Sequence, residues 1–225
     1  MLATSMFRAL FRMRLAATRL RGDSSGIAAT EFAFIVPIML VMFFGTVEMS
    51  SGVAVDRKVT FIARTLSDLT GQAPATDQAQ TYAQITDTYI QNVFTASIAI
   101  ITPYLQTPVK STISEIYVDK NAVAKIQWSK AATISSGATQ ATLTSSSRNA
   151  GDTVTSLVPT ALLIKQTYLI FSEVSYLYTP TIGYVMAPAG VTISDVSYTR
   201  PRQATCVVYN SLPAQNPTGT NCPLL

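Results

Sequence analysis

Two residues near the start of the chain, Gly26 and Glu31, have the types and spacing for peptide-bond cleavage followed by formation of an ion pair. They belong to the segment GIAATEF, which lies between a basic leader and an uncharged apolar run over residues 32–47. If the chain is cut after Gly26, Ile27 gains a free amino group, and Glu31 follows four residues later. Residues four apart share a helix face, so the ammonium and the carboxylate can pair. A carboxylate beside a bilayer is costly without such a partner.

The residues around this segment predict a membrane anchor. Five arginines and one acid precede Ile27, and the arginine excess predicts a cytoplasmic N-terminus. Residues 27–47 supply about the 20 residues needed to cross roughly 30 Å of hydrocarbon. Three interpretations remain: a leader cut before the apolar run, an uncleaved signal anchor, or a secretory signal cut near Gly52-Val53-Ala54. The long basic region and Glu31 directly before the apolar run favour the leader.

The block GIAATEFAFIVPIMLVMFFGTVEMS, continuing through Ala63-Arg64, resembles the TadE-like domain of tight-adherence (Tad/Flp) pilus assembly proteins, which are pseudopilins or minor pilins. Weaker similarity to TadE- and TadG-type proteins extends through VKSTISEIYVDKNAVAKIQWS, EVSYLYTP and SYTRPR, and the short length favours TadE. The positions that match the motif are Gly26, Glu31, Phe32, Pro37, Gly45 and Glu48.

This resemblance implies partners and a processing step. A prepilin peptidase of the inner membrane would cleave between Gly26 and Ile27, because a glycine leaves the backbone open to the enzyme. Glu31 would then pair with an N-terminal ammonium of its own chain or a neighbour and set the register of subunits. Phe32 and Pro37 complete the motif that the assembly machinery would read. The implied partners are the inner membrane, the peptidase, and other pilins and Tad assembly proteins, in homo- or hetero-oligomers.

The same resemblance and the arginine bias give an expected location. We expect a single-pass protein of a bacterial inner membrane, with a cytoplasmic N-terminus and a periplasmic or extracellular C-terminal domain. Nucleic acid is not an expected partner. The formal net charge of +4 comes from the leader, and residues 27–225 are formally neutral, so no basic face remains for phosphates.

The composition also argues against catalysis. The chain has no histidine, which excludes Ser-His-Asp and Cys-His chemistry. It has no CxxC pair and no phosphate-binding or nucleophile-elbow motif. We therefore predict no enzyme, no cofactor and no metal site. The remaining carboxylates are isolated in sequence, with Asp119 expected in a turn and Glu173 and Asp195 on wet strand faces. The isolated carboxylates are Glu115, Asp119, Asp152, Glu173 and Asp195.

The hydrophobic periodicity predicts an α+β fold. A long N-terminal transmembrane helix continues as an amphipathic spine, a second helix follows from Thr76-Asp77 to about Ile101, and a small antiparallel sheet completes the domain. The alternative to one long helix is a break at Ser50-Ser51-Gly52. The spine's apolar stripe is Val55, Val59, Ile62, Leu66 and Leu69. The expected parts are residues 1–26 (leader), 27–70 (transmembrane and spine helix), 71–103 (second helix) and 104–225 (extracytoplasmic β-rich domain).

The second half of the chain shows strand patterns. Residues 112–118 and 123–128 flank the turn-forming tetrad DKNA and predict a β-hairpin. Alternation places Ala124, Ile126 and Trp128 on its buried face, opposite Lys125 and Gln127. The Ser/Thr/Ala/Gly-rich residues 131–155 predict a solvated, weakly structured excursion. Two further strands are expected over 162–178 and 191–198.

The two cysteines, Cys206 and Cys222, lie in the last twenty residues. In an extracytoplasmic chain they most simply form one disulfide, which closes a C-terminal loop. The alternative is two free thiols.

Two functions of different kinds follow from these observations. The first is a pseudopilin-like component of the Tad/Flp pilus assembly and secretion apparatus that supports pilus biogenesis and surface adhesion. The second is an uncleaved, signal-anchored extracytoplasmic binding module or adhesin. In the second case, residues of the C-terminal region would carry recognition: Tyr198, Arg200, Arg202 and Tyr209.

Overall fold

The computed structural model describes residues 25–75, 82–180, 189–209 and 222 of the chain. The chain divides into two compact units, residues 1–49 and residues 50–225. The basic leader before residue 25 and the predicted helix cap at residues 76–77 lie outside the described residues.

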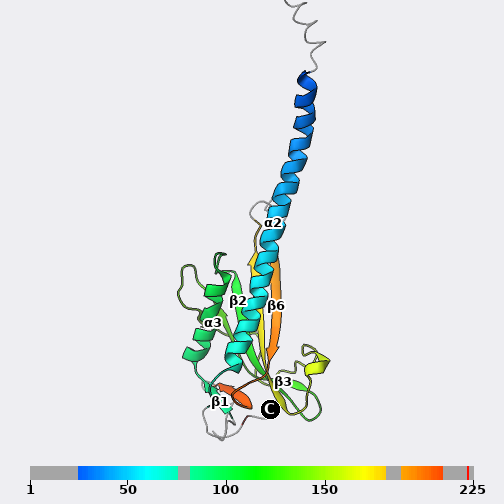
Figure 1. Cartoon of the computed structure of the whole chain (residues 1–225). Helices are drawn as coiled ribbons and strands as arrows, with labels where there is room; N and C mark the ends of the chain where they lie inside the picture. The colour runs from blue at the N-terminus through cyan, green and yellow to red at the C-terminus, as the bar shows by residue number, and fades with distance from the viewer. Residues whose placement is uncertain (1–24, 76–81, 181–188, 210–221, 223–225) are drawn as a thin grey trace, which may run out of the picture. The chain divides into compact units, whose positions relative to one another are not determined.

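Helix α2 spans Ser25–Gly71 and begins in the first unit (Figure 1). Ser50, Ser51 and Gly52 are helical, so the prediction of a continuous helix is confirmed and the alternative break there is wrong. Pro37 lies inside the helix. The residues of α2 within the first unit are almost all exposed, as expected for an apolar surface that this chain does not itself cover.

The part of α2 that belongs to the second unit has a buried stripe. Val55, Val59, Ile62 and Leu66 are fully buried, which confirms the predicted amphipathic periodicity. The helix ends at Gly71, where a side chain would approach the backbone oxygen of Arg200 to 3.2 Å. A glycine therefore lets the chain after β6 cross the end of α2.

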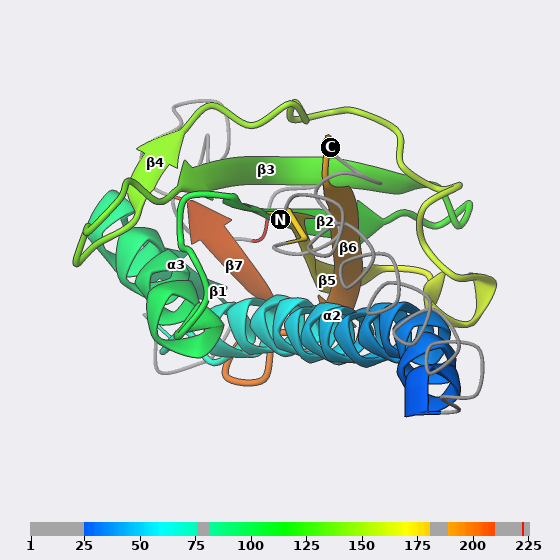
Figure 2. The same cartoon turned by 90° about the horizontal axis from the view of Figure 1, so that it is seen from above.

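A five-stranded antiparallel sheet and a two-stranded parallel sheet form the β part of the second unit, which confirms the α+β class. The larger sheet has the order β4-β3-β2-β5-β6, and the smaller pairs β1 with β7. Figure 2 shows α3 (Asp87–Ile101) and the later turns of α2 on the same face of the larger sheet. The strands are β1 (Tyr82–Ile85), β2 (Val109–Val118), β3 (Ala124–Thr133), β4 (Thr142–Thr144), β5 (Thr167–Tyr178), β6 (Val191–Thr199) and β7 (Cys206–Tyr209).

The second helix is shorter than predicted. It begins at Asp87, where the Thr86 side chain caps it by accepting a hydrogen bond from the backbone N–H of Tyr89. The preceding residues form β1, whose partner is β7, more than 120 residues further along the chain. The predicted start near residue 76 is wrong. Tyr82 and Ile85 are three residues apart and so have the spacing of one helix face, but they pair instead with a strand that is distant in sequence.

The predicted hairpin of β2 and β3 is confirmed, with longer strands. The Asp119 carboxylate accepts hydrogen bonds from the backbone N–H groups of Asn121 and Val123, as its predicted turn role requires. The predicted common face of Ala124, Ile126 and Trp128 is wrong.

A β-bulge explains this error. The register shifts so that Glu115 pairs with Trp128 while Ile116 pairs with Ile126, which leaves Gln127 as the extra residue. Trp128 consequently packs in the core under the helices, whereas Ile126 packs in a second core on the opposite face of the sheet. Gln127, which alternation predicts to be wet, is fully buried.

The second core also changes the interpretation of the connection between β3 and β5. Val154 and Val158 are buried against Ile126 and Phe171, so this connection covers a sheet face. The backbone N–H of Val154 donates to the carbonyl of Ala124 at 2.8 Å. The predicted solvated excursion over residues 131–155 is therefore partly wrong, because β4 lies within it and Val154 packs on the sheet.

The predicted Cys206–Cys222 disulfide is present, with the two Cα atoms 5.8 Å apart. Cys206 opens β7 and is fully buried beside Tyr117 and Tyr168. The disulfide thus ties the end of the chain to a strand that is itself packed against the main sheet.

Replacing both cysteines by alanine should lower the free energy of unfolding by about 3 kcal/mol, because the unfolded chain regains the entropy of an open loop. Urea denaturation of the detergent-purified protein, followed by the fluorescence of the single tryptophan, measures this loss. Wild-type protein under a reducing agent should lose the same amount. An unchanged unfolding midpoint in the double variant would show that the disulfide contributes nothing to stability.

Candidate functional site

The predicted processing and assembly motif lies on exposed turns of α2. Gly26, Ile27, Glu31, Phe32 and Pro37 are all helical and all exposed. Ile27 and Glu31 are about 6 Å apart along the helix axis at 1.5 Å per residue, and they lie on nearly the same face. The helix therefore provides the spacing on which the predicted ion pair depends.

The immediate surroundings of these residues are open. A side-chain carbon built on Gly26 would meet no atom within 4 Å. The Thr30 hydroxyl donates to the Ile27 carbonyl at 2.8 Å, which is a local bond within the helix. Within the described part of the chain, no ion pair involves Glu31. The motif thus has room for a side chain at Gly26 and an exposed carboxylate at Glu31.

The apolar part of α2 has the length and composition of a membrane-spanning helix, and its most apolar window has none of its residues buried. Phe32 is 69% exposed, and Val41 is 73% exposed. A core helix of a globular protein would bury much of such a surface. This N-terminal helix is accordingly a candidate membrane anchor.

Residues 26–66 match the family model described as TadE-like protein. The match confirms the resemblance of the N-terminal block and is consistent with a TadE-like pilus assembly protein. It does not extend to the segments of weaker similarity in the second half of the chain. This TadE-like segment contains the predicted processing motif, the apolar run and most of the buried stripe of α2. No curated protein and no solved structure matched the chain in the comparisons.

A second group of polar residues lies inside the globular unit, around Glu115. Its side chain is fully buried, and its Oε1 atom accepts a hydrogen bond from the backbone N–H of Val207 at 2.6 Å. Its Oε2 atom accepts from the indole N–H of Trp128 at 3.1 Å, and the same N–H donates to the Val207 carbonyl at 2.6 Å. Two side chains from β2 and β3 therefore bind both backbone groups of one residue in β7.

Glu115 and Trp128 supply hydrogen bonds to β7 that a second neighbouring strand would otherwise supply. β7 pairs with β1 along one edge, and Glu115 and Trp128 satisfy the backbone of Val207. Tyr209, at the end of β7, packs on the Trp128 ring with centroids 5.6 Å apart. The Lys130 ammonium lies 4.6 Å from the centroid of the Tyr209 ring, a cation–π distance.

Burial gives Glu115 an unusual pKa. Desolvation raises the pKa of its carboxyl to about 8, while the hydrogen bonds from Val207 and Trp128 oppose this rise. Burial, together with the charge of Glu115, also raises the pKa of the Tyr168 hydroxyl. The sequence carried one signal for this site: Glu115 alternates with Ile113 and Tyr117, so a carboxylate stands on an otherwise apolar strand face.

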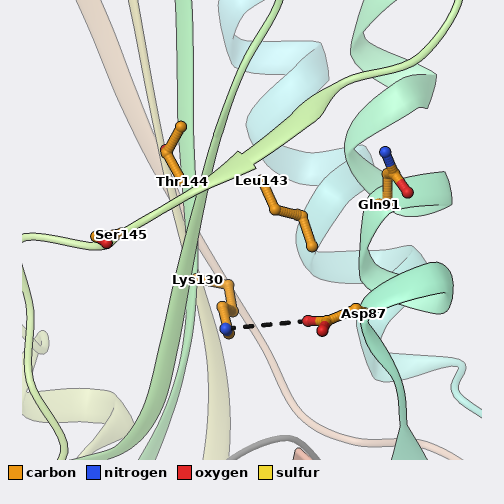
Figure 3. Close-up of a pocket in the computed structure, with 6 residues that line it drawn as sticks. All are labelled: Asp87, Gln91, Lys130, Leu143, Thr144 and Ser145. Carbon is orange, nitrogen blue, oxygen red and sulfur yellow. Dashed lines mark ion pairs between the residues drawn. The ribbon is translucent and has the colours of Figure 1, made fainter.

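A polar hollow of about 480 Å³ lies between α3, β3 and β4 (Figure 3). The Lys130 ammonium is 3.9 Å from the Asp87 carboxylate across it, and the Gln91 amide donates to the Ala141 carbonyl at 2.9 Å. These polar groups already have partners within the fold. The polar contacts around the hollow therefore connect α3 to the edge of the sheet. Its lining residues include no nucleophile that is hydrogen-bonded to a base.

The other carboxylates that the sequence offers are also engaged in the fold. Asp152 accepts a hydrogen bond from the backbone N–H of Asn149 at 2.7 Å, and Asp195 accepts one from Val196 at 2.8 Å. Glu173 forms a two-point ion pair with Arg148, so its predicted role on a wet strand face is only partly right. Among the described residues, no group of three possible metal ligands is present.

Three of the four residues considered for recognition take part in packing. The Tyr198 hydroxyl donates to the Leu157 carbonyl at 2.7 Å, Arg202 pairs with Asp68, and Tyr209 is buried. Arg200 is exposed. A recognition surface built from these side chains has little support in the fold.

The raised pKa of Glu115 should give the protein a characteristic pH dependence. Between the ordinary value of 4.5 and the folded value of about 8, the folded state holds one more proton than the unfolded state. The free energy of unfolding should therefore fall as pH rises through this window, by up to about 1.4 kcal/mol per pH unit, and level off above it.

Urea denaturation at several pH values, followed by Trp128 fluorescence, tests this expectation in the wild type and in Glu115→Gln. The glutamine variant should lose this part of the slope. Asp195→Asn, which removes a carboxylate from β6, should keep it. Equal slopes in wild type and Glu115→Gln would show that Glu115 does not titrate in this range.

Proposed function

We propose that this protein is a membrane-anchored, pseudopilin-like component of the Tad/Flp pilus assembly and secretion apparatus, which supports pilus biogenesis and surface adhesion. The observation that carries the proposal is the coincidence of the TadE-like match with an exposed apolar helix in which Glu31 follows Ile27 by four residues. The role is structural, as it is in TadE-like pilus proteins, and the proposal includes no catalysis, cofactor or metal.

In this proposal the four parts of the chain have separate tasks. The basic leader of residues 1–26 stays in the cytoplasm and is removed by a prepilin peptidase. The helix of residues 27–70 holds the protein in the inner membrane and then packs against other pilins. Residues 71–103 and 104–225 form, together with the later turns of that helix, the domain on the periplasmic or extracellular side. The arginine bias of the leader supports this orientation.

The N-terminus of the mature protein tests the processing step directly. Intact-mass measurement or Edman sequencing of the membrane-extracted protein should find a chain that begins at Ile27. A chain that begins at Met1 would support the alternative, an uncleaved anchor that displays a binding module. A chain that begins at Val55 would contradict both, because it would have lost its anchor.

Gly26→Leu should abolish processing and leave the protein at its full mass. The change should not disturb the fold, since a side-chain carbon at Gly26 meets no atom within 4 Å. Ala33→Leu is the matched control, because Ala33 is an exposed residue of the same helix that is not among the motif positions. Both variants should accumulate in the membrane, but only the Ala33 variant should be cut. Normal cleavage of Gly26→Leu would rule out this bond as the processing site.

Glu31→Ala and Glu31→Gln should both reduce pilus formation to background, because neither side chain can pair with an N-terminal ammonium. Electron microscopy of the cells and a surface-attachment assay measure the loss, and intact mass shows whether the variants are still processed. Asp56→Ala, which removes an exposed acid further along α2, is the control and should assemble normally. Normal pili in both processed Glu31 variants would contradict the proposed register role.

A further inference from the structure

Exposed apolar side chains gather at one end of the globular unit, close to the point where α2 enters it. Leu105 is 74% exposed, and Leu177 is 44% exposed. They come from the connection after α3 and from the end of β5. Together with residues of α2 and β6 they form a set that we call the apolar rim: Val53, Leu105, Leu177 and Val191.

Contacts place these residues together. Ser51, Leu105, Leu177 and Tyr178 border one hollow of about 310 Å³. A side-chain carbon built on Gly52, next to Val53 in α2, would lie 3.8 Å from the Tyr178 ring. Val191 is the register partner of Tyr178. The rim therefore adjoins the α2 turn at residues 51–53.

A partly buried polar contact holds the chain segment that carries the most exposed rim residue against α2. The Lys58 ammonium donates hydrogen bonds of 2.6 Å to the carbonyls of Ile100 and Thr102. It also lies 5.9 Å from the centroid of the Tyr104 ring. The connection that carries Leu105 is thus held against the helix within two turns of Ser51.

The covalent chain limits how far this rim can be from lipid. The uncharged apolar run ends at Val47, four residues before Ser51. Four residues span about 6 Å as a helix and at most about 14 Å fully extended. The polar headgroup region of a bilayer is about 5–8 Å thick on each side. If the run spans the membrane, Ser51 must lie in or directly beside the headgroups.

The chemistry of the rim suits that region. Leucine and valine side chains can enter the boundary of the acyl chains, and tyrosine rings are enriched at the membrane–water interface. Tyr104 and Tyr178 are half-buried behind the rim, so each keeps part of its ring accessible. Exposed leucines at this end would be unfavourable in water, and lipid would cover them without any further protein.

We propose that the apolar rim rests in the headgroup region of the membrane that holds α2, so that the globular unit is bound to lipid by its own surface as well as by the helix. The proposal rests on the proposed function only in requiring that residues 27–47 span the membrane. Its partner is a lipid surface.

Site-directed spin labelling of the full chain in liposomes of phosphatidylethanolamine and phosphatidylglycerol tests the proposal. A nitroxide at Leu177→Cys reports on the rim. The matched control is Ile164→Cys, which is 47% exposed. It lies beside Thr167 at the opposite end of β5, and Thr167 is about 33 Å from Leu177 at 3.3 Å per residue. A third label, at Val41→Cys in the apolar run, reports whether the helix is inserted.

Power saturation with oxygen and a water-soluble nickel chelate measures the exposure of each label. The Leu177 label should be several-fold less accessible to nickel than the Ile164 label, and a label at Leu105→Cys should behave like the Leu177 label. If the Leu177 and Ile164 labels are equally accessible while the Val41 label is protected, the rim proposal is overturned and the anchor stands.

Two further outcomes would also overturn the proposal and identify the reason. A Val41 label in water would remove the membrane anchor itself, and with it the basis of the rim. Protection of the Leu177 label that disappears on dilution of the protein in lipid would assign the rim to a second copy of the chain. Protection that persists at high lipid-to-protein ratios supports the lipid surface.

Discussion

α2 is a single helix, but the side chains of its two parts have different surroundings. Over residues 32–47 the apolar side chains surround the helix and remain exposed, so water is an unfavourable environment for that surface. From Val55 onward most of the apolar residues occupy a single stripe of the helix, and this stripe is buried in the core. A helix satisfies its own backbone hydrogen bonds and can therefore continue from lipid into a globular core.

The sheet depends on the second half of this helix. The Ser172 hydroxyl donates to the Ala63 carbonyl at 2.5 Å, and the Ser67 hydroxyl donates to that of Ser197 at 2.9 Å. These bonds fix the helix against β5 and β6, beside which it lies in Figures 1 and 2. α3 then fills the rest of the same face, and the chain after β3 folds back to cover the other.

The C-terminal strand is held by a different kind of interaction. β7 is short and parallel to β1, and such a pair is weak by itself. Glu115 and Trp128 supply hydrogen bonds to Val207 from inside the core, where a missing partner would be costly. Burying a carboxyl for this purpose is tolerable because its raised pKa keeps it neutral at ordinary pH.

Local patterns predicted the elements whose partners are close in sequence. The stripe from Val55 to Leu66 and the hairpin around Asp119 follow from period and turn chemistry, and the disulfide follows from the number of cysteines. Prediction failed where a distant partner decides the structure. Tyr82 and Ile85 form a strand only because β7 is available, and Trp128 changes face because of a bulge at Gln127. The exposed motif residues of α2 were recognisable because they do not depend on packing.

The proposed function is supported by a polar group that has no partner in the described fold, and not by the hollows of the globular unit. The polar groups of the hollow near Lys130 are engaged with neighbours, and the carboxylates at Asp119, Asp152 and Glu173 serve turns and an ion pair. An enzyme needs reactive groups that are positioned and still available for a substrate. Among the described residues, Glu31 lies exposed on an apolar helix and takes part in no ion pair, so its carboxylate can still pair with an ammonium. That is the partner which the proposed subunit assembly would provide.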